Sequence, residues 1–297
     1  MEDILLTLCI PTNGALQWVK NVIDSIYKQS CNNDLFEVVV VDNGDNSKLE
    51  EMIQWYHLKN LRYVRSDVQG FSNQVRALKY GKGKYIKLLN HRSLLVDGAL
   101  GKLIEMVKQN EKEKAVLFCS NGHMGSEQSI KFDSFDFFID KLSFWSSWSE
   151  GVGIWKDCLG IIDNIPLNPL FPAASLLFGM NNNHKYVIWN DIYEIQQKAE
   201  RKGGYNFFYA FAVVFLDMLN NLRIEHKISI SVFNRIRKDL YRNYLLGYYY
   251  KLVVEKNKYT FDLSCIHENM TVYYSSFHYY YMVFYGFVIL RIKNIFR

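Results

Sequence analysis

Apolar and polar residues follow two different periodicities along the first 120 residues of the chain. Residues 16–29 place apolar side chains at helical spacing, whereas residues 36–41 are apolar at every position, which is typical of a central parallel strand. Strand and helix patterns alternate roughly every 25 residues, which predicts right-handed crossovers in a parallel sheet. The expected strands are residues 5–10, 36–41, 61–65, 85–89 and 115–119, and the expected helices are residues 16–29, 48–57, 71–80 and 98–109.

The pattern changes after residue 120. Residues 121–134 are polar and rich in Gly and Ser, which predicts a loop. From residue 187 onward the apolar spacing predicts helices, including an amphipathic one at 232–252. We therefore predict an α/β fold with a Rossmann-like, mostly parallel central sheet and a helical C-terminal region. The expected parts are residues 1–120 as a ligand-binding α/β half, 121–186 as the second half of the same domain, and 187–297 as a helical extension.

Composition narrows the class of protein and its compartment. The 49% apolar content, with only 4 Pro and 17 Gly, excludes disordered and fibrous classes. The five cysteines form no C-x-x-C pair, which predicts a reducing compartment. The chain starts with Met1-Glu2-Asp3 and lacks the positively charged segment of a signal peptide, so we expect a cytoplasmic protein.

Basic residues are concentrated near the C-terminus. Residues 201–297 hold 14 Lys and Arg against 6 Asp and Glu, whereas residues 1–200 hold 21 against 24. The same part of the chain contains apolar, aromatic stretches at 205–222 and 277–290, the latter too short to span a bilayer as a helix. Two interpretations remain open: docking on an anionic membrane surface, or core helices with a solvated basic face. Nucleic acid is disfavoured as a partner because no binding motif accompanies the charge.

Polar and turn-forming residues follow each expected strand of the N-terminal half, at residues 11–14, 42–45, 66–67 and 90–93. In parallel sheets, ligands bind beyond the carboxyl ends of the strands. The dinucleotide-binding motif G-x-G-x-x-G does not follow the first strand, and the P-loop motif G-x-x-x-x-G-K-[ST] does not occur in the sequence. NAD and ATP are therefore disfavoured as cofactors.

Four segments keep a characteristic order and spacing. They are an apolar run ending in Pro11-Thr12, a run of valines ending in Asp42-Asn43-Gly44, the stretch Gly70-Phe71-Ser72-Asn73 followed by Arg76, and Gly83-Lys84-Tyr85-Ile86. Together they resemble family-two glycosyltransferases, inverting enzymes of the A-type (GT-A) α/β glycosyltransferase fold. The resemblance covers about the first 120 residues and makes residues 1–120 the nucleotide-sugar-binding half and residues 121–186 the acceptor-side half.

The resemblance implies a pocket for the nucleotide-sugar donor at these strand ends. Asp42 would accept hydrogen bonds from a base N–H or a ribose hydroxyl, and the Asn43 amide can both donate and accept. The alternative is that this segment is a solvated turn without a binding role, since Asn-Gly is a common turn sequence. The expected donor-binding residues are Pro11, Thr12, Asn13, Asp42, Asn43, Gly70, Asn73, Arg76 and Asn90.

Two departures from the family pattern affect the chemistry. Asn13-Gly14-Ala15 replaces the family's Tyr-Asn-Arg, and Asn90-His91-Arg92-Ser93 replaces its acidic D-x-D metal loop. A divalent ion that prefers oxygen ligands needs carboxylates. We therefore expect no metal cofactor, with Arg92 as a bidentate cation and His91 as a hydrogen-bond donor at the leaving diphosphate. The alternative interpretation is that the protein has lost catalytic activity and that its metal-binding residues were replaced as a result.

Inversion also needs a carboxylate that removes the proton of the acceptor hydroxyl. The family's acidic pair is missing from residues 171–175, so the remaining candidates are Glu150, Asp157, Asp163 and Asp191, each of which has an alternative as a helix cap or surface charge. Glu150 ranks first because it precedes Gly151 among aromatic residues, which themselves suit either sugar stacking or core packing.

We accordingly predict a transferase of polysaccharide biosynthesis that moves a sugar from a nucleotide sugar to a surface-glycan acceptor, including a lipid-linked one. It would work in the cytoplasm, in peripheral contact with the inner face of the membrane. The alternative function is a catalytically degenerate, glycosyltransferase-like binding or partner subunit. A nucleotidyltransferase is disfavoured because residues 11–20 lack the Gly-rich loop of that class.

Overall fold

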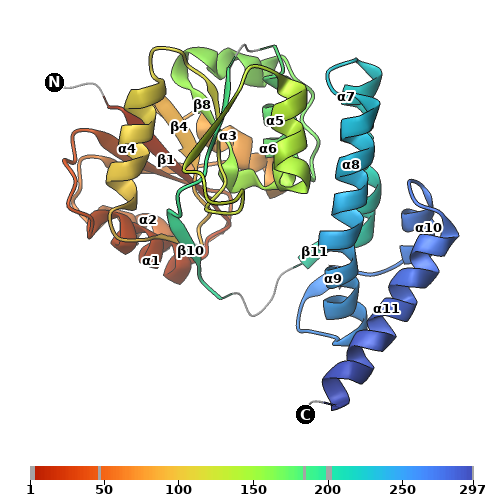
Figure 1. The fold of residues 1–297 in the computed structure, drawn as a ribbon. Coiled ribbons are helices and arrows are strands. Elements are labelled where there is room, and N and C mark those ends of the chain that lie inside the picture. Colours follow the sequence, from red (N-terminus) through yellow and green to blue (C-terminus); the bar gives the residue numbers. More distant parts are fainter. Residues whose placement is uncertain (1–3, 46–47, 183–184, 199–202, 296–297) are drawn as a thin grey trace. The chain divides into compact units, whose positions relative to one another are not determined.

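The computed structural model describes residues 4–45, 48–182, 185–198 and 203–295. These residues form two compact units, one within residues 1–198 and the other within residues 199–297. Figure 1 shows the elements of both, the first unit mixing strands and helices and the second being mainly helical.

The larger sheet of the first unit has the strand order β3-β2-β1-β4-β8 within the described residues. β1 pairs in parallel with β2 and β4, β2 pairs in parallel with β3, and β8 runs antiparallel to β4. The predicted α/β fold with a mostly parallel central sheet is therefore confirmed. The strands are β1 (Leu6–Thr12), β2 (Phe36–Asp42), β3 (Leu61–Arg65), β4 (Tyr85–Leu88) and β8 (Gly153–Trp155).

Side chains alternate between the two faces along each strand, so these apolar strands present apolar side chains on both faces of the sheet. Helices cover both faces and bury these side chains. Leu6, Leu8 and Ile10 of β1 join one buried cluster with apolar residues of α1, α2 and α4. On the opposite face, the thiol of Cys9 donates to the carbonyl of Ala77 in α3 at 3.3 Å. These helices span Leu16–Tyr27 (α1), Lys48–Gln54 (α2), Asn73–Leu78 (α3) and Ala99–Asn110 (α4).

A second sheet, of order β6-β9-β7 in the described part of the chain, corrects two expectations. β6 (Val116–Cys119) is the expected fifth strand, but it pairs in parallel with β9 (Tyr186–Trp189) and meets the larger sheet through a bridge from Phe118 to Val152. β7 (Ser129–Phe132) lies inside the predicted loop and pairs antiparallel with β9. Its side chains alternate between exposed and half-buried positions, so the sequence lacks a clear apolar strand signal there.

The predicted boundary at residue 187 is also wrong. Residues 186–189 form β9, and β10 (Glu194–Gln196) pairs antiparallel with β5 (Ser93–Leu95), so this segment is not the expected helix. Because its backbone pairs with strands of the first unit, that unit extends to residue 198. Its remaining α-helices within the described residues are α5 (Phe135–Leu142) and α6 (Pro172–Gly179).

The second unit is a helical array, as the sequence predicts. The amphipathic stretch expected at 232–252 is confirmed as a helical run over residues 230–254, which alternates α-helical and π-helical turns. No helix within the described residues is both long and apolar enough to cross a membrane. The elements are β11 (Gly203–Asn206), α7 (Phe215–Ile224), α8 (Ile230–Leu240), α9 (Leu246–Tyr249), β12 (Thr260–Asp262), α10 (Ile266–Thr271) and α11 (Ser276–Ile295).

Candidate active site

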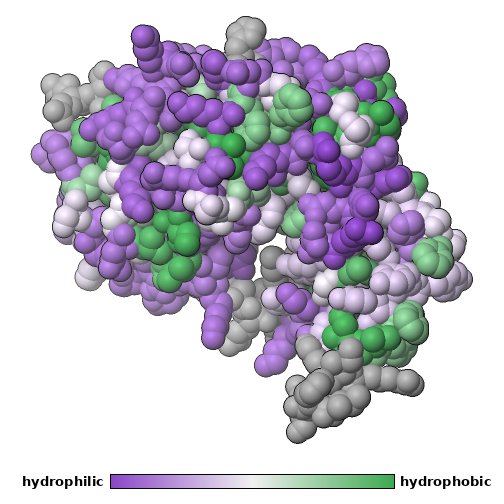
Figure 2. Space-filling view, viewed as in Figure 1, coloured by the Kyte–Doolittle hydropathy of each residue, from purple (hydrophilic) through white to green (hydrophobic). Residues whose placement is uncertain are grey.

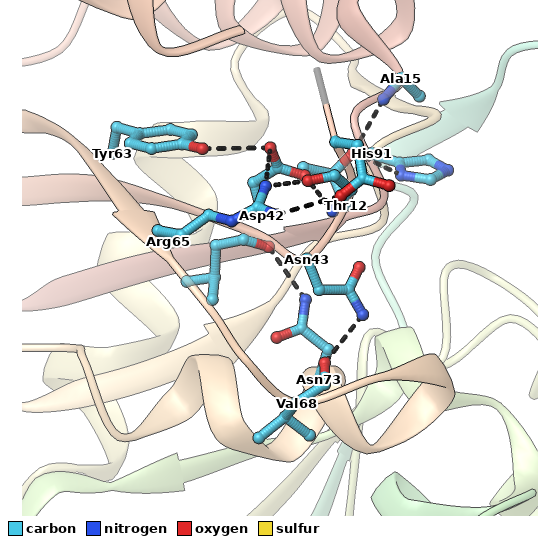
Figure 3. A network of polar contacts seen from close by, with 12 residues as sticks. Thr12, Ala15, Asp42, Asn43, Tyr63, Arg65, Val68, Asn73 and His91 are labelled. Carbon is cyan, nitrogen blue, oxygen red and sulfur yellow. Dashed lines mark hydrogen bonds and ion pairs between the residues drawn. The ribbon is translucent and has the colours of Figure 1, made fainter. Parts of the chain in front are cut away.

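The carboxyl ends of β1, β2 and β4 meet at one edge of the larger sheet. The backbone N–H of Asn43 donates to the carbonyl of Thr12 at 3.0 Å, which joins the ends of β2 and β1. A ring nitrogen of His91, from the loop after β4, lies 3.1 Å from the hydroxyl of Thr12. Figure 3 shows these contacts converging. The structure therefore brings Thr12, Asp42, Asn43 and His91, four of the predicted site residues, together at this edge.

The carboxylate of Asp42 is completely buried at the end of β2. One oxygen accepts from the backbone N–H of Gly44 at 2.9 Å. The other accepts from the hydroxyl of Tyr63 at 3.1 Å and lies 3.5 Å from the guanidinium of Arg65. Both oxygens are thus engaged within the protein, but Oδ1, which Gly44 contacts, accepts one hydrogen bond within the described residues and can accept a second.

Two asparagines define the side of the site formed by β2 and α3 (Figure 3). The amide of Asn43 donates to the carbonyl of Val68 at 2.8 Å, and the amide of Asn73 donates to the carbonyl of Val41 at 3.0 Å. The Oδ1 atom of Asn73 is buried and has no hydrogen-bond partner within the described residues. One turn later in α3, Nε of Arg76 is also buried and has no hydrogen-bond acceptor within the described residues. Buried polar atoms are nearly always satisfied, so these two atoms lack a partner that such groups normally have.

Backbone packing shapes the floor of the site. A Cβ added to Gly44 would overlap the backbone of Asn13, so the turns after β1 and β2 lie in direct contact. Asn13 itself is exposed and Pro11 is half-buried. Gly70 has a φ of 64° in the turn before α3, a left-handed conformation that favours glycine.

The loop after β4 is held by its own hydrogen bonds. The side-chain oxygen of Asn90 accepts from the backbone N–H of Arg92 at 3.0 Å, and the carbonyl of Arg92 accepts from the backbone N–H of Gln197 at 2.8 Å. The guanidinium of Arg92 lies 5.6 Å from the ring centre of Trp18, and its buried Nε has no acceptor among the described residues. Arg92 is therefore a positioned cation with an unused donor.

His91 is held neutral in this loop. Burial, together with the charge of Arg92, lowers the pKa of His91 to about 4. Its ring is tilted against Trp18, with the centres 5.5 Å apart. At neutral pH the imidazole can therefore donate or accept one hydrogen bond, but it carries no positive charge.

These residues do not fit the divalent metal ion that the family resemblance implies. Asn90 already uses its side-chain oxygen, Arg92 carries a positive charge, and no carboxylate stands at positions 90–93. Across the described residues, no cluster of three His, Cys, Asp or Glu side chains could hold a metal. An ion that requires several carboxylate or carbonyl oxygens would lack ligands here.

Two buried carboxyl groups lie directly behind the loop. Glu150 accepts from the backbone N–H of Asn90 at 3.1 Å. The amide of Gln196 donates to Glu150 and to Glu194, each at 3.0 Å, so the two acceptor oxygens lie at most 6 Å apart. Glu150 is 2% exposed and Glu194 is 3% exposed.

Burial raises the pKa of both groups. It raises the pKa of Glu194 to about 8, with help from the charge of Glu150, and it raises the pKa of Glu150 despite the attraction of Lys87. At neutral pH this pair therefore holds at least one proton.

Lys87 supplies the positive charge of this buried cluster. Its ammonium group donates to the backbone carbonyls of Leu88 at 3.0 Å and of Glu150 at 2.5 Å, and it lies 3.2 Å from the hydroxyl of Tyr193. Lys87, Glu194 and Gln196 are not among the site residues predicted from the sequence. A lysine inside the apolar strand 85–89 was the available signal, because a buried cation needs partners.

The other candidate carboxylates do not contact this site. Asp157 and Asp163 are exposed and form ion pairs with Lys114 and Lys79. Asp191 accepts from the amide of Gln128 at 2.7 Å. Of the four candidates, only Glu150 makes a hydrogen bond to the loop after β4 in the described structure.

Comparisons with known proteins identify what this arrangement resembles. A family model described as glycosyl transferase family 2 matches residues 7–143. A sequence from Methanocaldococcus jannaschii, named uncharacterized glycosyltransferase MJ1057, is 28% identical over 116 residues. That match covers 37% of this chain and 39% of the relative, so it spans about two fifths of the length of the relative.

Solved structures share the fold. Staphylococcus aureus TarS (residues 1–349, in complex with UDP-GlcNAc) is 16% identical, with a TM-score of 0.62 over 85% of this chain and 77% of that one. The mannosyltransferase PcManGT from Pyrobaculum calidifontis, in complex with GDP-Man and Mn²⁺, is 14% identical, with a TM-score of 0.53 over 99% of this chain and 88% of that one. At these identities the similarity demonstrates the fold alone.

Proposed function

Because residues 7–143 match a family model described as glycosyl transferase family 2, we propose that this protein is an inverting glycosyltransferase that moves one sugar from a nucleotide sugar to a surface-glycan acceptor. The observation that carries the proposal is the loop after β4, where His91 contacts Thr12 at the end of β1 and the adjacent Arg92 has a buried Nε without an acceptor among the described residues. An enzyme that breaks a sugar–diphosphate bond needs such a donor where negative charge develops.

The donor belongs to the class of nucleoside diphosphate sugars. The relatives support this class, since TarS was solved with UDP-GlcNAc and PcManGT with GDP-Man. In this chain the base and ribose would bind along Asp42, Asn43 and Asn73, whose unused Oδ1 accepts a hydrogen bond from a ligand N–H or O–H.

We also propose that the reaction needs no metal ion. The PcManGT complex contains Mn²⁺, but positions 90–93 of this chain lack the carboxylates that would bind one. Arg92 can bond two phosphate oxygens at once through its planar guanidinium, and neutral His91 can donate one further hydrogen bond. These two groups would stabilise the departing nucleoside diphosphate.

Glu150 is the proposed general base. It would take the proton of the acceptor hydroxyl while that oxygen bonds to the anomeric carbon, and the bonding electrons would leave with the diphosphate. A raised pKa suits this role, because a base works best when its pKa lies near the working pH. Since Glu150 is 2% exposed, the role requires the loop of residues 90–93 to shift when the acceptor binds.

The proposed acceptor is a growing surface glycan, including one linked to a lipid, reached by peripheral contact with the inner face of the membrane. The concentration of basic residues in the C-terminal third supports this contact, because anionic lipid surfaces attract such segments.

A second candidate function is a binding or partner subunit without catalysis. It is favoured by the carboxylate of Asp42, whose oxygens are already bonded within the protein. The glycosyltransferase function predicts cleavage of the bond between the anomeric carbon and the diphosphate, whereas the partner-subunit function predicts no cleavage.

The deciding experiment measures nucleotide binding by calorimetry and donor turnover with and without EDTA. We expect binding of a nucleoside diphosphate, turnover that survives EDTA, and a loss of about 10²–10³ in kcat for Arg92→Ala. The charge-matched control is Lys82→Ala, an exposed residue before the start of β4. Nucleotide binding without turnover of any donor would favour the partner subunit, and strict dependence on Mn²⁺ would reject the metal-free reaction.

A further inference from the structure

The second unit contains a cavity of about 810 Å³ between α8 and the start of α11. This volume is typical of sites for small organic ligands. Its positively charged lining comes from Arg237, Lys238 and Arg242, and its aromatic lining comes mainly from Tyr241, Tyr273, Tyr274, Phe277 and Tyr281.

The three cations of this cavity have no acidic partners. Lys238 and Arg242 are exposed, and half-buried Arg237 donates to the backbone carbonyl of Tyr273 at 3.1 Å. In the part of the chain that the structure describes, no carboxylate lies within ion-pair distance of any of the three. Neighbouring cations repel one another, and a phosphate group would remove this repulsion and accept hydrogen bonds from the guanidinium groups.

The aromatic walls present ring surfaces more than hydroxyl groups. The hydroxyl of Tyr241 donates to the carbonyl of His278 at 2.7 Å, and that of Tyr274 donates to the carbonyl of Arg237 at 2.9 Å. These two hydroxyls are already used, which leaves the walls suited to the apolar part of a ligand.

An exposed aromatic face of α11 continues from this cavity. Phe277, Tyr280, Tyr281, Phe284 and Phe287 are 73%, 64%, 44%, 65% and 60% exposed, and their spacing places them on one side of the helix. Phe277 and Tyr281 also line the cavity. In Figure 2 apolar surface is visible at the lower right, in the region of α11. A contiguous aromatic face of this kind typically marks a contact with a lipid surface or a partner.

We propose that this cavity binds the phosphate of a membrane lipid, with the lipid chain lying along the aromatic face of α11. A soluble nucleotide would satisfy the cations but would leave the aromatic face in water. A lipid phosphate matches both features. The lipid is either an anionic phospholipid of the bilayer or a lipid-linked acceptor, and the second source rests on the function proposed above.

The test measures binding of the full-length protein to vesicles by flotation. Three vesicle types are compared: phosphatidylcholine alone, and phosphatidylcholine with phosphatidylglycerol or with a polyprenyl phosphate at equal surface charge. The variant Lys238→Gln with Arg242→Gln removes two unpaired cations, and Lys256→Gln with Lys258→Gln removes two exposed lysines outside the cavity. A second variant, Phe284→Ser, changes the aromatic face without altering charge.

We expect the cavity variant to lose about 25-fold in vesicle affinity, about fivefold per charge, and the control to lose less than threefold. Phe284→Ser should also weaken binding to both anionic vesicle types. Tighter binding to polyprenyl phosphate than to phosphatidylglycerol assigns the lipid-linked source, and equal binding assigns the bilayer phospholipid.

Three results would overturn the proposal: no vesicle binding by the wild type, equal losses in the cavity variant and the control, or self-association through α11 in place of lipid binding. Nucleotide binding in the first unit is measured separately by calorimetry, so failure here is distinguishable from failure of the proposed function.

Discussion

Replacing Glu194 by Gln should remove a loss of stability that the first unit suffers as the pH rises. Glu194 accepts from the amides of Asn121 and Gln196, each at 3.0 Å, and shares its surroundings with Glu150. Gln has the same shape and cannot ionise, so it mimics the protonated carboxyl group that burial favours. The substitution therefore removes the titration while leaving the packing nearly unchanged.

The expected magnitude follows from the pKa of Glu194, which burial raises to about 8. Below its ordinary value near 4.5, the folded and unfolded states both hold the proton, and the contribution of this group to stability is complete. As the pH rises toward 8, the unfolded chain releases the proton while the folded unit keeps it, so the free energy of unfolding falls. Between pH 5 and pH 8 the wild type should lose roughly 3 kcal/mol relative to Glu194→Gln.

Tryptophan fluorescence in urea measures this difference within the first unit, because all six Trp residues lie before residue 199. Exposed Glu50→Gln is the control, and it should show no pH-dependent difference from the wild type. A difference between Glu194→Gln and the wild type that stays constant from pH 5 to pH 8 would refute the reasoning. It would mean that Glu194 titrates as an ordinary surface carboxylate.

Three further outcomes are expected. Lys87→Met should lower the free energy of unfolding by about 3 kcal/mol, measured in urea, because the buried carbonyls of Leu88 and Glu150 lose their donor and the carboxyl pair loses the attraction of Lys87. Gly44→Ala should destabilise the first unit by about 2 kcal/mol or more and weaken nucleotide binding in calorimetry, because the new Cβ overlaps the backbone of Asn13. His91→Gln should leave the shape of the kcat/KM profile unchanged between pH 5 and pH 9, because the pKa of His91 is about 4 and the ring is neutral throughout; a basic or acidic limb that disappears in the variant would contradict this.

Much of the parallel sheet could be predicted from sequence because each of its strands is locally distinctive. β2 is apolar at nearly every position and buried on both faces, and β3 was predicted with its observed bounds, Leu61–Arg65. The turn residues directly after these strands then predicted the position of the site. Thr12, Asp42, Asn43 and His91 do lie together, because parallel strands place their carboxyl ends at the same edge.

The remaining parts depend on partners that are distant in sequence. β5 and β10 are three residues long and pair across about 100 residues, so neither has a periodic signal of its own. The same pairing brings Glu194 and Gln196 behind the loop after β4, which is why both were missed. Glu150 was selected for its aromatic neighbours, but its distinguishing contact is the hydrogen bond to Asn90, which no local pattern reveals.

The buried carboxyl cluster and the half-buried loop of residues 90–93 are in direct contact. A metal ion would fix the leaving diphosphate and the loop at once, whereas a guanidinium on a flexible loop would have to be ordered during the reaction. Here the loop is ordered in advance by the bond from Asn90 to Glu150 and by the bond from Gln197 to the carbonyl of Arg92. Donors that are already positioned stabilise developing charge without reorganisation. The hydrogen bond from Asn90 to Glu150 therefore holds the loop that carries Arg92 before any acceptor binds, and the proposed base role of Glu150 would require that bond to break.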